Sequence, residues 1–355
     1  MSNRQTGIRG ALPVIKVDNT DNADLTAGLQ SLSIKETTEG LYTCEALVNN
    51  WGDVGGRPGY LYFDRRTVEF GKSIAVSFDG ATLFNGLLMA MEAQFPEGGG
   101  AGITLLCEDR FQDLRMTRRS RCFENQSDAD VFRSIASDHG LGAQVQFSGP
   151  THKVLAQVNQ TDLAFLRQRA MVSDVELWID GSDLHAQTHG SRGGRPVQLS
   201  YPATLREFSV CADIAGQRTG IVVSGWDIAA KAALSYEATD QVISGELNAM
   251  TSGPSILSSK RGTRKATVAH LTPHTQQETQ AVAESLFKEM ARRFVRGVGV
   301  AETSGDIHVG ATVDLQNLGP LFSGRYYVTE ATHLFDREKG IRTEITVERP
   351  GLGQP

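Results

Sequence analysis

The chain has 355 residues, of which 40% are hydrophobic and 21% are charged, and its formal net charge is −6. This composition is typical of a globular protein with two or three domains, and the acidic balance argues against a nucleic-acid-binding protein with a broad basic face. The polar segment 1–10 lacks the apolar stretch of a signal peptide, and no apolar run approaches the roughly 20 residues that cross a bilayer. We therefore expect folding in a cytoplasm, without membrane insertion.

The first part of the chain, residues 11–110, is predicted to consist of strands and turns. Glycines and a proline predict a loop over 49–59. The glycines at 98–100 indicate a flexible hairpin turn rather than a phosphate-binding loop, because no Gly-Lys-Ser/Thr follows them. The expected strands cover residues 12–17, 31–35, 41–48 and 103–107.

The composition changes at Glu108, where a small α+β unit is predicted to begin. Ser127 and Asp130 have the spacing of a capping box, and the helix that follows is expected to end at Gly140. A second helix is predicted to start at Thr161. The expected strands of this unit cover residues 144–147, 175–179 and 184–186, and a flexible loop is expected at 189–196.

Strands resume after residue 201. The segment 243–263 is rich in serine and glycine and predicts an exposed, flexible loop. The longest helix is predicted over 276–294, where apolar residues recur at helical spacing on one face. The expected strands cover residues 205–212, 220–226, 295–300, 326–335 and 341–347, and the last two form a hairpin because apolar and charged residues alternate along them.

Two stretches of the sequence resemble each other. Gly71 and Gly310 each open a strand, and each copy ends in a β-rich run, at Phe95 or Phe335. Between the glycine and the end of each copy lies a Leu-Phe-x-Gly sequence that predicts a turn. The turn residues are Phe84 and Gly86 in the first copy and Phe322 and Gly324 in the second. The repetition suggests one β-module used twice. We therefore predict a β-rich α+β protein with two β-modules in residues 1–108 and 201–355, and with the small α+β domain, 109–200, inserted between them.

No catalytic, cofactor or metal site can be nominated. His185 and His189 lie four residues apart, as do His270 and His274, but no glutamate or cysteine completes either set. The sequence contains no Gly-x-Ser-x-Gly or His-Glu-x-x-His motif, and no pair of carboxylates stands out as a glycosidase pair. We expect the four scattered cysteines to be reduced and mostly buried, and the tryptophans to be packing residues. These are Cys44, Cys107, Cys122 and Cys211, and Trp51, Trp178 and Trp226.

Four arginines form the sharpest charge feature of the sequence. They are Arg115, Arg118, Arg119 and Arg121. The cluster can be interpreted as a contact surface for phosphate or for a partner chain, or as the solvated face of a strand.

Several segments resemble the phage late control gene D family and VgrG proteins. They lie at 83–100 (LFNGLLMAMEAQFPEGGG), 113–141, 158–170, 222–233 (VVSGWDIAAKAA) and 322–336 (FSGRYYVTEATHLFD). The resemblance implies a structural hub of a contractile injection machine, such as a phage tail, a tailocin, a type VI system or an extracellular particle, made in a bacterial cytoplasm and assembled into its baseplate. It implies a homotrimer with two tube-like β-barrels per chain, placed between a sixfold tail tube and a threefold spike.

The resemblance also implies the partners. They are a tail tube protein, other baseplate components and a spike or needle on a separate polypeptide, because VgrG proteins continue into a needle whereas this sequence stops at Pro355. Two alternatives come from other classes: a tail-associated cell-wall hydrolase, and, with less support, a nucleic-acid-binding module that uses Arg115–Arg121. The hydrolase lacks a nominated acid, base or nucleophile.

Overall fold

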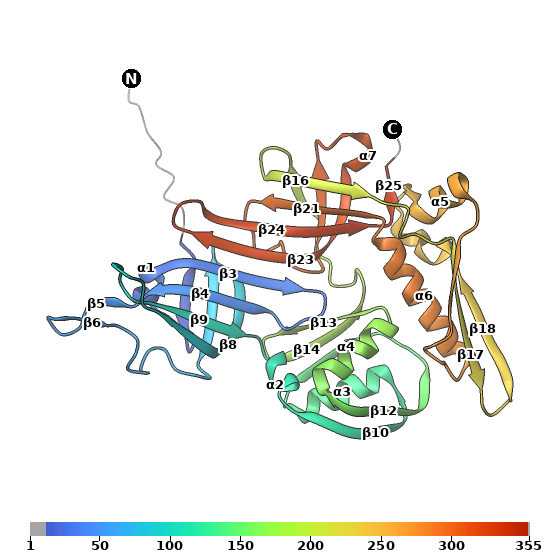
Figure 1. Ribbon diagram of the computed structural model, residues 1–355, viewed down its shortest axis with the longest axis horizontal. Coiled ribbons are helices and arrows are strands. Elements are labelled where there is room, and N and C mark those ends of the chain that lie inside the picture. The colour runs from blue at the N-terminus through green and yellow to red at the C-terminus, as the bar shows by residue number, and fades with distance from the viewer. Residues whose placement is uncertain (1–11, 354–355) are drawn as a thin grey trace.

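A large, mostly antiparallel sheet is the main feature of the molecule (Figure 1). The computed structural model describes residues 12–353, and there strands from both ends of the chain join into one 13-stranded sheet. The strands are β1 (Val14–Val17), β2 (Thr20–Asp21), β3 (Leu29–Thr37), β4 (Thr43–Asn49), β7 (Ser73–Phe78), β8 (Ala81–Gln94), β9 (Gly102–Glu108), β15 (Val197–Ser200), β16 (Leu205–Ala212), β21 (Val295–Ala301), β22 (Thr312–Gln316), β23 (Gly324–Asp336) and β24 (Gly340–Arg349).

Their order is β16-β21-β24-β23-β3-β4-β9-β8-β7-β1-β2, with β22 beside β23 and β15 beside β22. The long strand β8 joins two parts of this path, because its first half pairs with β7 and its second half with β9. The backbones approach closely there, and a Cβ at Gly86 would overlap the carbonyl oxygen of Glu108. The predicted hairpin of the last two long strands is confirmed as β23 and β24.

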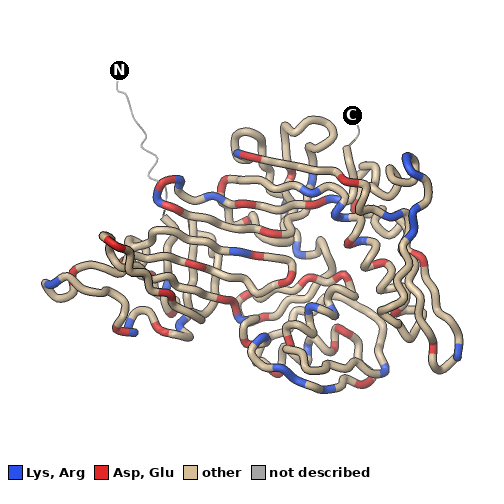
Figure 2. Tube along the Cα trace, viewed as in Figure 1, with Lys and Arg blue, Asp and Glu red and all other residues tan. Residues whose placement is uncertain are grey.

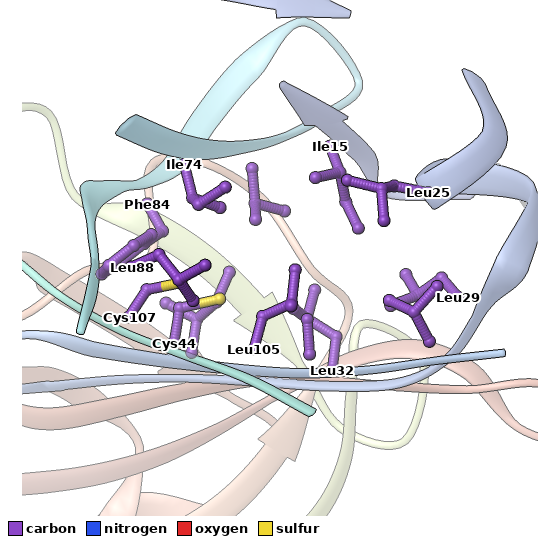
Figure 3. Close-up of a cluster of buried hydrophobic side chains, with 14 of the residues drawn as sticks. Ile15, Leu25, Leu29, Leu32, Cys44, Ile74, Phe84, Leu88, Leu105 and Cys107 are labelled. Atoms are coloured by element: carbon purple, nitrogen blue, oxygen red, sulfur yellow. The ribbon is translucent and has the colours of Figure 1, made fainter. Parts of the chain in front are cut away.

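One hydrophobic core lies between two parts of the main sheet: strands β3, β4 and β9 on one side, and strands β1 and β7 with α1 (Ala23–Gly28) on the other (Figure 3). Ile15 and Ile74 point from that layer toward Leu105 and Cys107 of the sheet. Alternation along each strand places these residues on one face and leaves mostly polar residues, with Leu47 and Leu106, on the other face. Burying apolar area at about 25 cal/mol per Å² makes this cluster a principal source of stability for the sheet.

The predicted α+β unit forms between Glu108 and β15. Ser127 and Asp130 make a reciprocal capping box, and the Thr161 hydroxyl accepts the backbone N–H of Ala164, so both predicted helices begin where the caps indicated. Phe132 and Leu166 are fully buried in its own core. Its elements are α2 (Phe111–Arg115), β10 (Arg118–Ser127), α3 (Asp128–Asp138), β11 (Gly142–Gln146), β12 (Thr151–Thr161), α4 (Asp162–Val172), β13 (Val175–Asp180) and β14 (Asp183–Thr188).

The chain between β16 and β21 leaves the main sheet and forms a separate layer. The longest helix, α6 (Gln276–Arg292), packs against a three-stranded sheet through Val282, Ala283 and Phe287, which confirms the predicted helix to within two residues of its end. The other elements here and near the C-terminus are β17 (Gly220–Asp227), β18 (Ala232–Ala238), η1 (Asp240–Glu246), β19 (Thr251–Ser252), α5 (Gly253–Arg261), β20 (Lys265–Val268), α7 (Gly319–Phe322) and β25 (Gly351–Leu352).

The segment 243–263 is not the flexible loop that its composition predicted. It contains α5, which begins where the Ser252 hydroxyl accepts the N–H of Ser255 and Pro254 occupies the first turn. The helix ends at Gly262, whose φ of +71° few other residues adopt readily. Serine, proline and glycine act here as helix caps, so their abundance does not indicate disorder.

Two further expectations need correction. The predicted loop 49–59 contains a short hairpin of β5 (Trp51–Asp53) and β6 (Pro58–Tyr60), which turns at the positive-φ residues Gly55 and Gly56. β15 lies within the predicted insert, but it pairs with β22 of the main sheet. The inserted unit therefore ends a few residues before residue 200.

The predicted barrels and turns also differ from the structure. Within residues 12–353 no barrel closes in one chain, and the sheet path ends openly at β16 and β2. Phe84 and Gly86 lie inside strand β8, where they pair with Val76 and Ile74, and they do not form a turn. Phe322 ends α7 and Gly324 begins β23.

Candidate assembly interface

Two four-stranded groups within the main sheet have the same strand order. The first unit is β3-β4-β9-β8, and the second unit is β16-β21-β24-β23. A glycine with positive φ precedes the strand that pairs with the first half of β8 in the first unit, which is β7, and of β23 in the second, which is β22. The N–H of Gly71 donates to the carbonyl of Leu88 at 2.8 Å, and the N–H of Gly310 donates to the carbonyl of Val328 at 3.0 Å.

β-Bulges occur at matching places in the two units. One follows Leu88 in β8 and one follows Val328 in β23, each directly after the residue that bonds the glycine. Another pair follows Leu29 in β3 and Leu205 in β16. A bulge adds one residue to one strand and fixes the pairing register. The two units can therefore be compared position by position.

This comparison changes the alignment that the sequence suggested. Counting from the bulges, Phe95 corresponds to Phe335, the residues at which the two similar sequence stretches end. Phe84, however, corresponds to Gly324 and not to Phe322. The connection between β22 and β23 contains α7. This helix shifts the second Leu-Phe-x-Gly sequence relative to the strand register, so it does not occupy the same position as the first.

The two units meet where β3 pairs with the second half of β23. Leu32 lies opposite Phe335, and Ile34 lies opposite His333. All four side chains are buried, with exposed fractions of 2%, 4%, 0% and 1% in that order. We call this contact the covered junction, because each strand edge in it has a partner.

The corresponding edges at the two ends of the units have no such partner. Within the described residues, β16 pairs only with β21, and the second half of β8 pairs only with β9. Phe95 is 64% exposed, although the corresponding Phe335 is buried. We call β16 and the second half of β8 the open edges. Figure 1 shows them on opposite sides of the two joined units.

An apolar surface lies beside the open edge of β8. Met91, Ala93 and Ile103 line a hollow of about 190 Å³ together with the segment 62–68. Next to it, four aromatic side chains form a chain of ring contacts with centroids 4.9–6.1 Å apart. They are Trp51, Tyr60, Phe63 and Phe95, and all are exposed.

The face of the sheet opposite the core carries charged and polar side chains together with Leu47, Leu106 and Leu334. A groove of about 410 Å³ runs over it, and its lining includes Glu45, Glu92, Asp336 and Arg342. Aspartate and glutamate residues occur along β4, β8, β23 and β24 (red in Figure 2). This surface has charges but no constellation that resembles a catalytic centre.

The four arginines are held largely by contacts within the chain. Arg115 pairs with Glu108, Arg118 donates to the carbonyl of Asn159, and Arg119 lies 3.3 Å from Asp162. Arg121 lies deeper and pairs with both Asp138 and Asp162. Burial would raise the pKa of Asp162, but hydrogen bonds from His139 and Gln157 and the nearby arginine charges hold it below its usual value.

A buried ionic cluster connects the inserted unit to α6. His152 lies 2.6 Å from Glu278 of α6 and 3.3 Å from Asp128, which also binds Arg169 at 2.5 Å. Burial opposes the charged imidazole, yet hydrogen bonds to Asp128 and Glu278 raise the pKa of His152 to about 9. Nothing in the sequence pointed to this cluster, because its members come from α3, β12, α4 and α6.

A second group of buried polar residues lies at the covered junction. Glu36 accepts the backbone N–H of Val309 at 3.0 Å, and burial raises its pKa to about 7 although Arg192 opposes the shift. The guanidinium of Arg192 lies over the ring of Trp178, 4.5 Å from its centroid. The predicted flexible loop 189–196 therefore includes a residue that is anchored in the interior.

The remaining candidate residues do not form a metal site. No group of three or more metal-binding side chains occurs among residues 12–353. His185 stacks on Trp178, and His189 pairs with Glu176. Two sequence expectations are only half right, because Cys122 and Cys211 are exposed, and so are Trp51 and Trp226.

Among residues 12–353, no helix is both long and apolar enough to span a membrane.

Solved structures with a similar fold come from phage tails and a secretion system. A prophage tail protein from Shewanella oneidensis matches with a TM-score of 0.68 and 13% identity, covering 96% of this chain and 98% of that one. A tail protein from Neisseria meningitidis has a TM-score of 0.70 at 11% identity, covering 97% and 98%. An Escherichia coli component of the type VI secretion system has a TM-score of 0.59 at 11% identity, covering 96% and 79%.

These similarities establish that the fold is the β-rich fold of phage tail and type VI proteins. A comparison with curated protein sequences finds no match. A family model described as the Alg8 N-terminal domain matches residues 66–336, and the expected phage late control gene D family is not the one that matches. Since that match spans most of the sequence, the chain belongs to the family of the Alg8 N-terminal domain.

Proposed function

We propose that three copies of this chain form the hub of a contractile injection machine. The hub is a ring that joins a sixfold tail tube to a threefold spike and nucleates the baseplate. The observation that carries this proposal is the pair of four-stranded units with the same strand order and the same bulge positions. A closed ring of three chains contains six units in alternation, so one end can match a sixfold partner while the ring keeps threefold symmetry.

The two units are, in this proposal, copies of one module that form wall segments of a tube-like barrel. The barrel closes only between chains, since the path within one chain is open at β16. The first module lies within residues 1–108, the second within 201–355, and the α+β unit of 109–200 projects from the wall, apart from β15. Large, obligate interfaces bury on the order of 2,000 Å² or more, and we expect that size here.

The partners follow from the same architecture. They are a tail tube protein on the pseudo-sixfold end, a separate spike or needle protein on the threefold end, and other baseplate components around the ring. The similar solved structures support this setting, because their names describe tail proteins and a type VI component likened to bacteriophage tail proteins. The role is structural rather than enzymatic, and assembly starts in a bacterial cytoplasm.

The arginine group gives the proposal a further contact surface. The side chain of Arg118 is exposed, and among residues 12–353 it donates to the carbonyl of Asn159 and pairs with no carboxylate, so its charge remains available to a neighbouring chain. We assign Arg115, Arg118, Arg119 and Arg121 to the neighbourhood of such a contact. Arg121 lies beneath that surface, where its ion pairs with Asp138 and Asp162 hold the neighbouring residues in place.

A cryo-electron microscopy map of the assembled particle, calculated without imposed symmetry, tests the proposal. We expect three copies of the chain around a hollow axis, with six similar sheet segments at the end that faces the tube. Six copies in the ring, or one copy that plugs the axis, would contradict it.

A further inference from the structure

We propose that β16 of one copy pairs with the second half of β8 of the next copy, in the register that β3 and β23 use within the chain. This inference rests on the proposed ring, and it names the residues that close it. Each chain supplies one open edge of each kind, at opposite ends of its two joined units. The contact is therefore heterologous, and repeated copies of it generate a ring when the rotation between copies closes, as the proposed threefold ring requires.

The bulges give the register. Because the bulges after Leu29 and Leu205 match, Leu32 corresponds to Phe208 and Ile34 to Val210. The match between β8 and β23 makes Phe95 the counterpart of Phe335 and Ala93 that of His333. Transferring the covered junction to the open edges places Phe208 opposite Phe95 and Val210 opposite Ala93 of the next copy.

Burial supports this assignment. In the covered junction the core-facing residues are almost inaccessible, whereas the corresponding Phe208 and Val210 are only partly buried and Ala93 is exposed. The apolar hollow beside Met91 and Ala93 gives the Val210 side chain a place to pack. Phe208 then reaches the exposed aromatic group that contains Phe95, where an aromatic pair adds to the burial of apolar area.

The polar face continues across the same contact. In the covered junction Lys35 lies opposite Thr332, and both belong to the polar face. The corresponding residues at the open edges are Cys211 of one copy and Glu92 of the next. Cys211 is a free, exposed cysteine, so the register places a natural thiol directly opposite a residue that can be replaced.

A second copy fits these edges better than an unrelated strand. The edge of β16 alternates between partly buried apolar residues and exposed polar ones, and the edge of β8 offers a matching apolar side and polar side. An exposed strand edge that stays unpaired promotes aggregation, so a partner that completes it also protects the protein. The pairing would extend the sheet from chain to chain without any new element.

Cysteine cross-linking of the full chain tests the register. We would introduce Glu92→Cys into a Cys122→Ser background, oxidise the protein over a range of concentrations, and separate the products on a non-reducing gel. Directly opposed residues on antiparallel strands have Cα atoms about 4.5–5.5 Å apart, which falls within the range that a disulfide spans. We expect disulfide-linked species of up to three chains.

Three controls accompany this variant. Glu45→Cys places a thiol at another exposed carboxylate of the polar face, on the central strand β4, and should link far less. Glu92→Cys combined with Cys211→Ser should not link at all. Lys35→Cys with Thr332→Cys, in a background without Cys211, should form a disulfide within one chain and confirm that this pair geometry permits the bond.

Light scattering after size-exclusion chromatography separates the possible failures. A trimer in which Glu92→Cys links no better than Glu45→Cys would contradict the register and leave the proposed ring intact. Links that stop at two chains, or that extend to six, would support the register and contradict the threefold hub. Absence of both trimers and links at every concentration would contradict both.

Discussion

Phe335 and Phe95 occupy corresponding positions in two units with the same strand order, yet one is 4% exposed and the other 64%. The difference lies in the neighbouring strand. β3 covers the edge beside Phe335, while no strand of the described chain covers the edge beside Phe95. A residue at this position is therefore buried when a neighbouring strand pairs with the edge beside it, and exposed when none does. The covered junction shows what the open edges lack.

Truncating Phe335 is expected to have the largest effect on stability, and truncating Phe95 a much smaller one. Phe335→Ala should lower the free energy of unfolding by about 3–5 kcal/mol, because it removes a buried aromatic ring from a packed cluster. Phe95→Ala should change the stability of the isolated chain by no more than about 0.5 kcal/mol but weaken self-association. Urea unfolding and light scattering measure the two effects. Equal destabilisation by both substitutions would mean that Phe95 is already covered in the free chain.

A smaller effect on stability is expected from replacing Glu36. This residue lies in the covered junction, and its counterpart on the open edge of β16 is Ala212. Burial raises its pKa to about 7 from an ordinary value of 4.5, so the folded state keeps the acid neutral while the unfolded chain ionises. Its contribution to stability is therefore complete below about pH 4.5 and is lost as the pH rises through 7.

Glu36→Gln keeps a hydrogen-bond acceptor for the N–H of Val309 and removes the ionisation. We expect the variant to be more stable than the natural chain by roughly 1–3 kcal/mol at pH 8 and nearly equal to it at pH 4.5. Unfolding by urea at several pH values measures this slope. The exposed Glu45→Gln serves as the control, and a gain that does not depend on pH would rule out the titration of Glu36 as its cause.

The comparison also predicts a pH effect that belongs to the second unit alone. A short turn joins β3 to β4, but residues 213–294 join β16 to β21 and bring Glu278 to His152 of the inserted unit. The raised pKa of His152, about 9, means that its contribution to stability is complete below about pH 6.5 and is lost as the pH rises to 9. His152→Gln should lower the Tm at pH 6 and have little effect above pH 9. His270→Gln, in an exposed loop, should have little effect at either pH.

The smallest effect on the fold is expected at Arg118, outside both open edges. Arg118→Glu should alter the free energy of unfolding by no more than about 0.5 kcal/mol and reduce incorporation of the chain into particles, since charges at an interface govern association more than folding. Arg119→Glu is a poorer test because it would place a carboxylate beside the buried Asp162. Arg264→Glu is the matched control, because the exposed Arg264 also donates to a backbone carbonyl, that of Thr263. Equal incorporation of both variants would exclude Arg118 from a contact.

Local signals predicted the local parts of this fold. The capping residues Ser127 and Thr161 marked the starts of their helices, and alternation predicted the hairpin of β23 and β24. The sequence did not reveal α5, because its serine and glycine caps resemble loop composition. Nor did it reveal the pairing of β3 with β23, which joins strands far apart in the chain.

The candidate interface was harder to predict than the fold. Gly71 and Gly310 each donate to the carbonyl of the residue before a bulge, but the similar Leu-Phe-x-Gly sequences aligned Phe84 with Phe322, whereas the bulges align Phe84 with Gly324. Similar letters need not share a strand register, because register depends on bulges and cross-strand pairs. The open edges are visible only when burial at corresponding positions is compared. The ionic clusters at Arg121 and His152 likewise depend on side chains brought together from separate elements.

The covered junction also bears on the thermodynamics of ring closure. In the proposed ring of three chains, one polypeptide carries both units, so half of the six wall contacts form during folding, at the high effective concentration of an intramolecular reaction. Three contacts between chains then remain: two are association steps that each lose translational and rotational freedom, and the third closes the ring within the assembled complex. The covalent link also fixes the alternation of the two kinds of unit. A ring assembled in this way cannot contain two first units side by side, so errors of composition are excluded before the chains meet.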